Sequence, residues 1–67
     1  MSTQKVGFVV QELDTNMFLC EGEGDVDFTP FLHEADPFDC IEAAVETAQM
    51  VVGSNFKVTA VVVRVSH

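Results

Sequence analysis

The sequence predicts an α+β fold: a small antiparallel sheet of three to four strands with one helix packed on a face, in the order β-β-(β)-α-β. Three features lead to this prediction. Strand-like segments flank a turn within residues 5–21, a helical pattern covers residues 37–52, and a valine-rich segment follows at residues 56–65. With 67 residues, of which 48% are hydrophobic, the chain is expected to form one domain, residues 1–67.

The first predicted element is a β-hairpin. Residues 6–10 are rich in β-branched and aromatic side chains, which favour a strand. Residues 13–16, Leu-Asp-Thr-Asn, follow, and the side chains of Asp and Asn bond the local backbone in turns. Residues 17–20 then return as the second strand.

A third, shorter strand is one interpretation of Asp25 to Phe28. Polar and apolar residues alternate there, which is typical of a strand but also of an extended edge segment. Pro30 ends the segment, because proline has no N–H to donate to a sheet.

The helix is predicted over residues 37–52. Asp36 is a favourable N-cap, and Pro37 suits the first helical position because its φ is already helical. Apolar side chains then recur at spacings of three and four residues: Ile41, Ala44, Val45, Ala48 and Val52. Gly53 predicts the C-terminal end, since glycine is the usual residue after a helix.

The final strand has one apolar face and one face that is polar at its start and apolar at its end. The apolar end consists of three valines: Val61, Val63 and Val65. If only the other face of the strand met the helix, these valines would form an exposed patch, which is typical of an interface. A homodimer interface is one interpretation, and cover by the loop around residues 28–32 is the other.

Charge is segregated along the sequence. The formal net charge of −8 comes from 11 acidic and three basic residues. Every acidic residue lies between Glu12 and Glu46, whereas Lys5 precedes this stretch and Lys57 and Arg64 follow it. Because solvated surfaces normally mix both signs, the segregation indicates a surface for a positively charged partner.

Two groups of carboxylates are regularly spaced and form the predicted partner-binding site. The first lies at every second position: Glu21, Glu23, Asp25 and Asp27. In an extended backbone these would share one face at intervals of about 6.5 to 7 Å. The second would form a stripe on the predicted helix: Asp39, Glu42 and Glu46. Such rows resemble the charges of a nucleic-acid backbone, so the expected partner is a basic, nucleic-acid-binding protein. The alternative is that the acids only keep the protein soluble.

Other chemistry has little support in the sequence. An EF-hand loop beginning at Glu23 would place Phe28 where the sharp turn requires glycine. His33 with Cys40 could form a nucleophilic pair, but neighbouring carboxylates would oppose ionisation of the thiol. Three dispersed cations build no basic patch, which argues against direct binding of nucleic acid. We therefore expect no enzyme activity, no metal and no cofactor.

The expected location is the cytoplasm, with no membrane contact. Residues 1–5 lack a basic region followed by an apolar one, and no apolar run approaches the roughly 18 residues that cross a bilayer. Cys20 and Cys40 are too few for a disulfide framework and are expected to be free thiols that pack as small buried hydrophobes.

The order of these segments resembles a type of small bacteriophage-encoded protein. The features concerned are the strand and turn within residues 8–16, the step from Ala35 to Phe38, and the acidic, alanine-rich segment 41–48. In this order and in its acidity the chain is similar to the one-helix phage inhibitor of bacterial RNA polymerase and to small anti-CRISPR and DNA-mimic proteins. The resemblance implies stoichiometric blockade of a host nucleic-acid-binding complex in the bacterial cytoplasm.

A second function class stays open. The chain could be a non-catalytic structural or assembly module that homodimerises through the three valines of the final strand, with the acids serving only solubility.

Overall fold

The computed structural model has a four-stranded antiparallel sheet and one α-helix, which confirms the predicted α+β fold. It describes residues 2–22 and 26–66, and the side chains of residues 4–22 and 26–63. The elements are β1 (Ser2–Glu12), β2 (Phe18–Glu21), β3 (Val26–Thr29), the 3-10 helix η1 (Leu32–Glu34), α1 (Ile41–Val51) and β4 (Phe56–Ser66). The strand order in the sheet is β3-β2-β1-β4.

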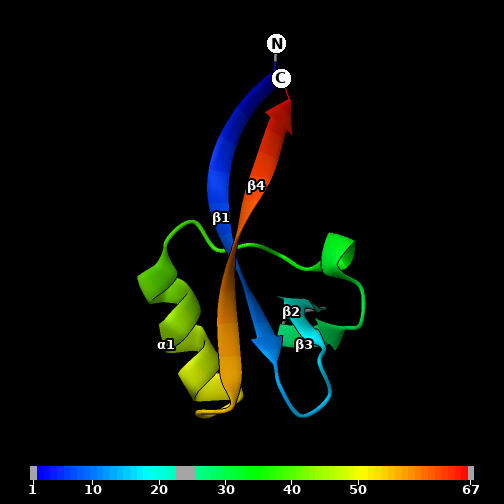
Figure 1. Ribbon diagram of the computed structural model, residues 1–67, viewed down its shortest axis with the longest axis vertical. Helices are drawn as coiled ribbons and strands as arrows, with labels where there is room; N and C mark the ends of the chain where they lie inside the picture. The colour runs from blue at the N-terminus through cyan, green and yellow to red at the C-terminus, as the bar shows by residue number, and fades with distance from the viewer. Residues whose placement is uncertain (1, 23–25, 67) are drawn as a thin grey trace.

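The first and last strands form a continuous ribbon. Both have 11 residues, and they pair along their whole length, from Ser2 opposite Ser66 to Glu12 opposite Phe56. Figure 1 shows that β1 and β4 extend together beyond the rest of the fold and that the two chain ends lie at the same end of the ribbon. The ribbon explains the long principal extent of 38 Å, against 23 and 21 Å in the other directions.

The opposite edge of β1 is shared between two short segments. β2 pairs with β1 only where Gln11 faces Phe18. Further along, Phe8 exchanges two backbone hydrogen bonds with Phe38, with N···O distances of 2.9 and 2.8 Å. The N–H of Asp36 meanwhile donates to Leu19 of β2 at 3.3 Å. Residues 36–38 therefore bridge β1 and β2 where the strands have stopped pairing, and the chain crosses β1 there on its way to α1 (Figure 1).

This bridge corrects the predicted start of the helix. The prediction placed residues 37–40 in the helix, but Phe38 is extended because both of its backbone groups bond Phe8. The helix begins instead at Ile41, with Cys40 as N-cap and no side-chain cap. Its predicted end is correct: Gly53 has φ 96°, and its N–H donates to Ala48 at 3.1 Å. Within the described residues, no helix is long and apolar enough to cross a membrane.

The core lies between α1 and one face of the sheet. Its fully buried members are Val10, Leu19, Ala44 and Ala48. Partly buried side chains surround them: Phe8, Phe28, Phe38, Phe56 and Val58. The two alanines let the helix approach the sheet closely, so that the phenylalanines close the sides of a small core.

The other face of the sheet is covered by the chain around η1. Val9, which is only 2% exposed, and half-buried Val61 line a hollow of about 380 Å³ together with Leu32. A side chain on Gly7 would lie 2.7 Å from Pro37 and 2.9 Å from Val63, so glycine permits this close packing.

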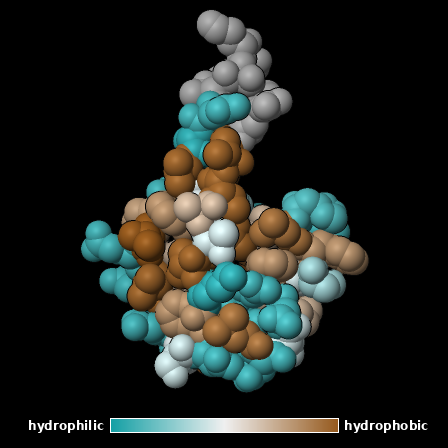
Figure 2. Space-filling model, in the orientation of Figure 1, coloured by the Kyte–Doolittle hydropathy of each residue, from teal (hydrophilic) through white to brown (hydrophobic). Residues whose placement is uncertain are grey.

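The predicted patch of three valines is therefore partly covered. Val61 and Val63 are half-buried, whereas the side chain of Val65 lies outside the described part of the chain. The most exposed described valine of β4 is Val62, 68% exposed, on the helix side of the sheet. Figure 2 shows hydrophobic residues gathered where the ribbon joins the body of the fold.

Candidate partner-binding surface

The first predicted row of carboxylates does not form as a row. Glu21 ends β2 and Asp27 lies in β3, and the chain reverses between them so that Glu21 faces Val26 and Asp27 faces Cys20. Residues directly opposite each other share a face of the sheet, so Glu21 and Asp27 lie on opposite faces. Gly22, the residue after β2, favours this reversal. Glu23 and Asp25 lie outside the described residues.

The second predicted row loses one member. Asp39 precedes the helix and forms an ion pair with Lys5, with an Nζ···Oδ1 distance of 2.9 Å. Glu42 and Glu46 do lie on the helix, one turn apart, and both are exposed. The stripe is thus reduced to these two glutamates.

Carboxylates gather instead around the Cys20 thiol. Partial burial raises the pKa of Cys20, and the negative charges of Asp27, Asp36 and Glu34 raise it further. Three segments of the chain supply these acids: β3, η1 and the bridge at residues 36–38. We call Asp27, Glu34 and Asp36 the acidic cluster.

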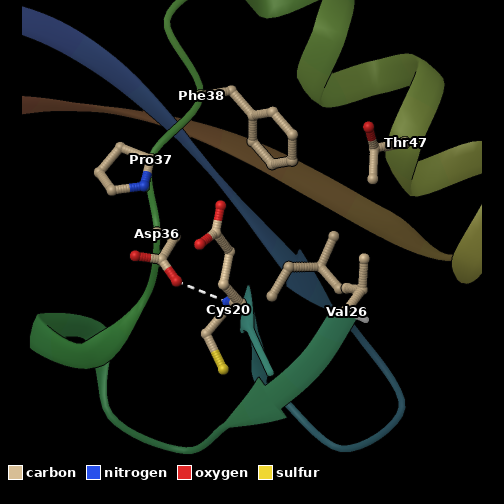
Figure 3. Close-up of a pocket in the computed structure, with 8 residues that line it drawn as sticks. Cys20, Val26, Asp36, Pro37, Phe38 and Thr47 are labelled. Atoms are coloured by element: carbon tan, nitrogen blue, oxygen red, sulfur yellow. Dashed lines mark hydrogen bonds between the residues drawn. The ribbon is translucent and has the colours of Figure 1, made fainter. Parts of the chain in front are cut away.

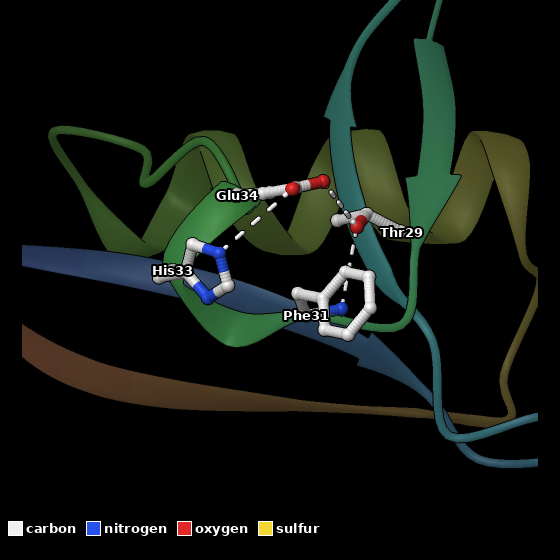
Figure 4. A network of polar contacts seen from close by, with 4 residues as sticks. All are labelled: Thr29, Phe31, His33 and Glu34. Carbon is white, nitrogen blue, oxygen red and sulfur yellow. Dashed lines mark hydrogen bonds and ion pairs between the residues drawn. The ribbon is translucent and has the colours of Figure 1, made fainter.

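Glu34 is held by the end of β3. Its Oε1 accepts a hydrogen bond from the buried Thr29 hydroxyl at 3.1 Å, and the same hydroxyl oxygen accepts the Phe31 N–H at 3.2 Å (Figure 4). The imidazole of His33 lies 3.8 Å from the other carboxylate oxygen and packs near the Phe31 ring. Because Thr29 and Asp27 are two residues apart in one strand, Glu34 is anchored on the sheet face that bears Asp27.

Asp36 is held by the edge of β2. Its carboxylate accepts the Glu21 N–H, and its own N–H donates to Leu19. Asp36 borders an open cavity of about 290 Å³ whose other walls include Phe38 and Thr47 (Figure 3). The carboxylate that was predicted to cap the helix therefore bonds the edge of β2 instead, and Asp36 as a residue is exposed.

Sequence reasoning missed Glu34 and Asp36 as partner-binding candidates. Their local signal was weak, because they lie in the irregular segment His-Glu-Ala-Asp and share no strand or helix periodicity with Asp27. The bridge to β1 and β2 positions Asp36, and the hydrogen bond from Thr29 positions Glu34 beside β3. The available signal was the number of acidic residues in the central stretch, which does not specify their arrangement.

The described residues offer little for catalysis. Cys40 is exposed and Cys20 half-buried, so the expected burial of both thiols is wrong for Cys40, although both are free. The raised pKa of Cys20 lowers the fraction of reactive thiolate at neutral pH. Among the residues that the structure describes, no three His, Cys, Asp or Glu side chains are placed to hold a metal ion.

Comparisons with known proteins give no relative: no family model, no curated protein and no solved structure matches this chain.

Proposed function

We propose that this protein is a phage-type stoichiometric inhibitor, of the anti-CRISPR or a similar anti-defence class. In this proposal it binds a basic, nucleic-acid-binding surface of a host protein complex in the bacterial cytoplasm. The acidic cluster is the centre of the contact. The single observation that carries the proposal is the placement of three carboxylates around the end of β2 and β3, in a chain with a net charge of −8. Asp27 lies opposite Cys20, Asp36 accepts the Glu21 N–H, and Glu34 accepts the Thr29 hydroxyl.

The distribution of cations supports this choice of surface. All three lie in the ribbon: Lys5 in β1, and Lys57 and Arg64 in β4. Among the described side chains, Lys5 forms the one ion pair made by a lysine, and its partner is Asp39. Asp39 does not belong to the acidic cluster. A basic partner would therefore meet uncompensated negative charge at the cluster, which favours fast, salt-sensitive association.

The anchoring of the cluster supports a binding role as well. One oxygen of Glu34 accepts a hydrogen bond from the Thr29 hydroxyl, and one oxygen of Asp36 accepts the Glu21 N–H. These bonds limit the side-chain freedom that binding would otherwise have to remove. Asp27 likewise accepts the Phe28 N–H at 2.8 Å. The remaining lone pairs of the three carboxylates can accept hydrogen bonds from arginine or lysine.

The test has two stages. The immobilised protein is first exposed to bacterial lysate at low and high salt, and we expect a basic nucleic-acid-binding protein that is released by salt. The purified partner is then titrated with wild-type protein and with a double variant, Asp27→Asn with Glu34→Gln. These amides keep the shape and one acceptor oxygen of each side chain but remove two charges. We expect the double variant to bind at least about tenfold more weakly, or about 1.4 kcal/mol.

The matched control is Glu42→Gln with Glu46→Gln, which removes the same charge from the exposed side of α1. It should bind within about threefold of wild type if the cluster is the contact. An equal loss in both double variants would mean that only net charge matters. Recovery of neutral or acidic partners alone, indifferent to salt, would contradict the proposal.

A further inference from the structure

We propose that the outer edge of β4 pairs with β4 of a second copy of this chain, joining two four-stranded sheets into one continuous antiparallel sheet. This inference is independent of the proposed function. The outer edge of β4 is the edge of the sheet opposite to β3. The proposed dimer and the proposed binding of a basic partner therefore use different surfaces, and either proposal can fail while the other holds.

The first argument is that β4 is a long and regular terminal strand. Its 11 residues, Phe56–Ser66, contain no proline or glycine, and β1 is its one neighbour in the described sheet. Devices that protect edge strands include short length, proline, bulges and charged side chains, above all lysine. The charged residues of β4 are Lys57 and Arg64, near its two ends, and the six residues between them, 58–63, are uncharged. The described register with β1 is unbroken, so β4 has no bulge that would turn its edge away from another strand.

The second argument is the direction of the backbone groups. Phe8 directs its N–H and C=O to Phe38, away from β4, and lies opposite Ala60. In an antiparallel pair, residues opposite each other both bond across the pair or both point away from it. Ala60 therefore presents its N–H and C=O at the outer edge, and so do Val58 and Val62 two residues on either side.

The third argument is that the pattern suits a two-fold axis. Full overlap of two antiparallel copies places Val61, the central residue of β4, opposite the Val61 of the second copy. Ala60 then pairs with the second copy's Val62, and both present the outward backbone groups that this requires. Lys57 and Arg64 would each face a valine, so no like charges lie directly opposite each other.

The fourth argument is charge. Two copies with a net charge of −8 repel each other, and the repulsion is least where carboxylates are absent. β4 has no Asp or Glu and holds two of the three cations. A second copy is therefore better accommodated at β4 than at β3, the other end of the sheet, which bears Asp27.

The fifth argument is the apolar character of the edge. Val62 is 68% exposed on the helix side, and half-buried Val61 borders the hollow on the other side. Pairing would place the second copy's Val61 opposite Val61 and its Ala60 opposite Val62, with its Val58 and Val62 as diagonal neighbours of Val62 on the same face. Apolar cross-strand neighbours of this kind stabilise adjacent strands. The hollows of the two copies would lie next to each other across the axis.

The experiment measures sedimentation from micromolar to millimolar protein, with two matched variants. Val62→Glu places a carboxylate at the proposed contact. Val6→Glu places the same group on the same face, because Val6 lies opposite Val62 in the neighbouring strand β1. Val6 is 54% exposed but lies one strand away from the edge. We expect a wild-type dimer whose dissociation constant rises at least about tenfold in Val62→Glu and less than about threefold in Val6→Glu.

Hydrogen exchange on the wild type gives a second readout that needs no variant. Protection of the Val58, Ala60 and Val62 amides should rise with protein concentration, because only pairing at the edge bonds them. A chain that stays monomeric up to millimolar concentration would overturn the proposal. So would a dimer that leaves these three amides unprotected, or protection that appears only with another protein.

Discussion

Along one edge, β1 pairs with β4 at every residue, whereas along the other it is held by Phe38 and by the start of β2. The continuous side has no carboxylate in β4, and the divided side brings the acidic cluster together. Segments held by few backbone bonds open more easily than long ladders. The comparison indicates that the proposed contact with a partner lies on the less stable side of the sheet.

The largest expected effect comes from removing the side chain that ties the divided side to the core. Leu19 is 2% exposed and packs against the helix and the sheet. Leu19→Ala should lower the free energy of unfolding by about 2–5 kcal/mol, because the lost burial adds to the cost of a cavity. In a domain of this size that loss would leave much of the protein unfolded, which circular dichroism and urea titration would show.

The control for this prediction lies in the ribbon. Val62→Ala removes an apolar side chain that is 68% exposed, so the free energy of unfolding should change by less than about 1 kcal/mol. Urea titration of the monomer, at a concentration low enough to avoid association, makes the comparison. Equal losses in the two variants would contradict the assignment of the core to the helix side around Leu19.

A smaller effect is expected at the residue where the two sides meet. A Cβ on Gly7 would lie 2.7 Å from Pro37 of the bridge and 2.9 Å from Val63 of the ribbon. Gly7→Ala should therefore cost about 1–3 kcal/mol through overpacking, and it should loosen the bridge first because fewer bonds hold it. Hydrogen exchange of the Phe8 and Phe38 amides, which bond each other's carbonyl groups, reports this loosening.

Gly53→Ala is the comparison for Gly7→Ala. Nothing lies within 4 Å of a Cβ at Gly53, but its φ of 96° disfavours any other residue. Gly53→Ala should also lower the free energy of unfolding by about 1 kcal/mol. The hydrogen exchange of the Phe8 and Phe38 amides should then change no more than that of the other protected amides. Matching exchange patterns in both variants would show that Gly7 has no special role at the bridge.

Sequence reasoning succeeded for elements whose signal is local. The alternation and β-branching of residues 56–65 predicted the last strand, and the turn at residues 13–16 was confirmed, with Asn16 at φ 62°. Apolar spacing likewise located the helix and Gly53 its end. These features depend on neighbours in the sequence, so the sequence is sufficient to predict them.

The start of the helix and the candidate site could not be predicted in this way. Asp36 and Pro37 resemble a helix start, but the backbone of Phe38 gains two hydrogen bonds from Phe8, 30 residues earlier. That long-range pairing also sets the position of Asp36 in the acidic cluster. The regular spacing of the acids led to the prediction of rows. Spacing alone contains no information about the reversal between β2 and β3, which places Glu21 and Asp27 on opposite faces.

The smallest expected effect concerns the turn where β1 leaves the ladder. The Asp14 N–H donates to the Glu12 carboxylate and lowers its pKa, partial desolvation opposes this, and the Thr15 hydroxyl and N–H lower it further. A carboxyl group whose pKa is lowered by folding stabilises the fold above its ordinary pKa, and that contribution disappears as pH falls through the lowered value. Acidification should therefore weaken the turn.

Glu12→Gln tests this dependence on pH. The amide keeps an acceptor for the Asp14 N–H but has no proton to gain, so the variant should lose less stability than wild type between neutral and acidic pH. Thermal unfolding at several pH values measures the difference. Thr15→Ala, which removes the hydroxyl donor 2.9 Å from Glu12, should shift the wild-type loss towards higher pH. If wild type and Glu12→Gln respond equally to acid, the Glu12 carboxylate does not stabilise the junction between the two sides of the sheet.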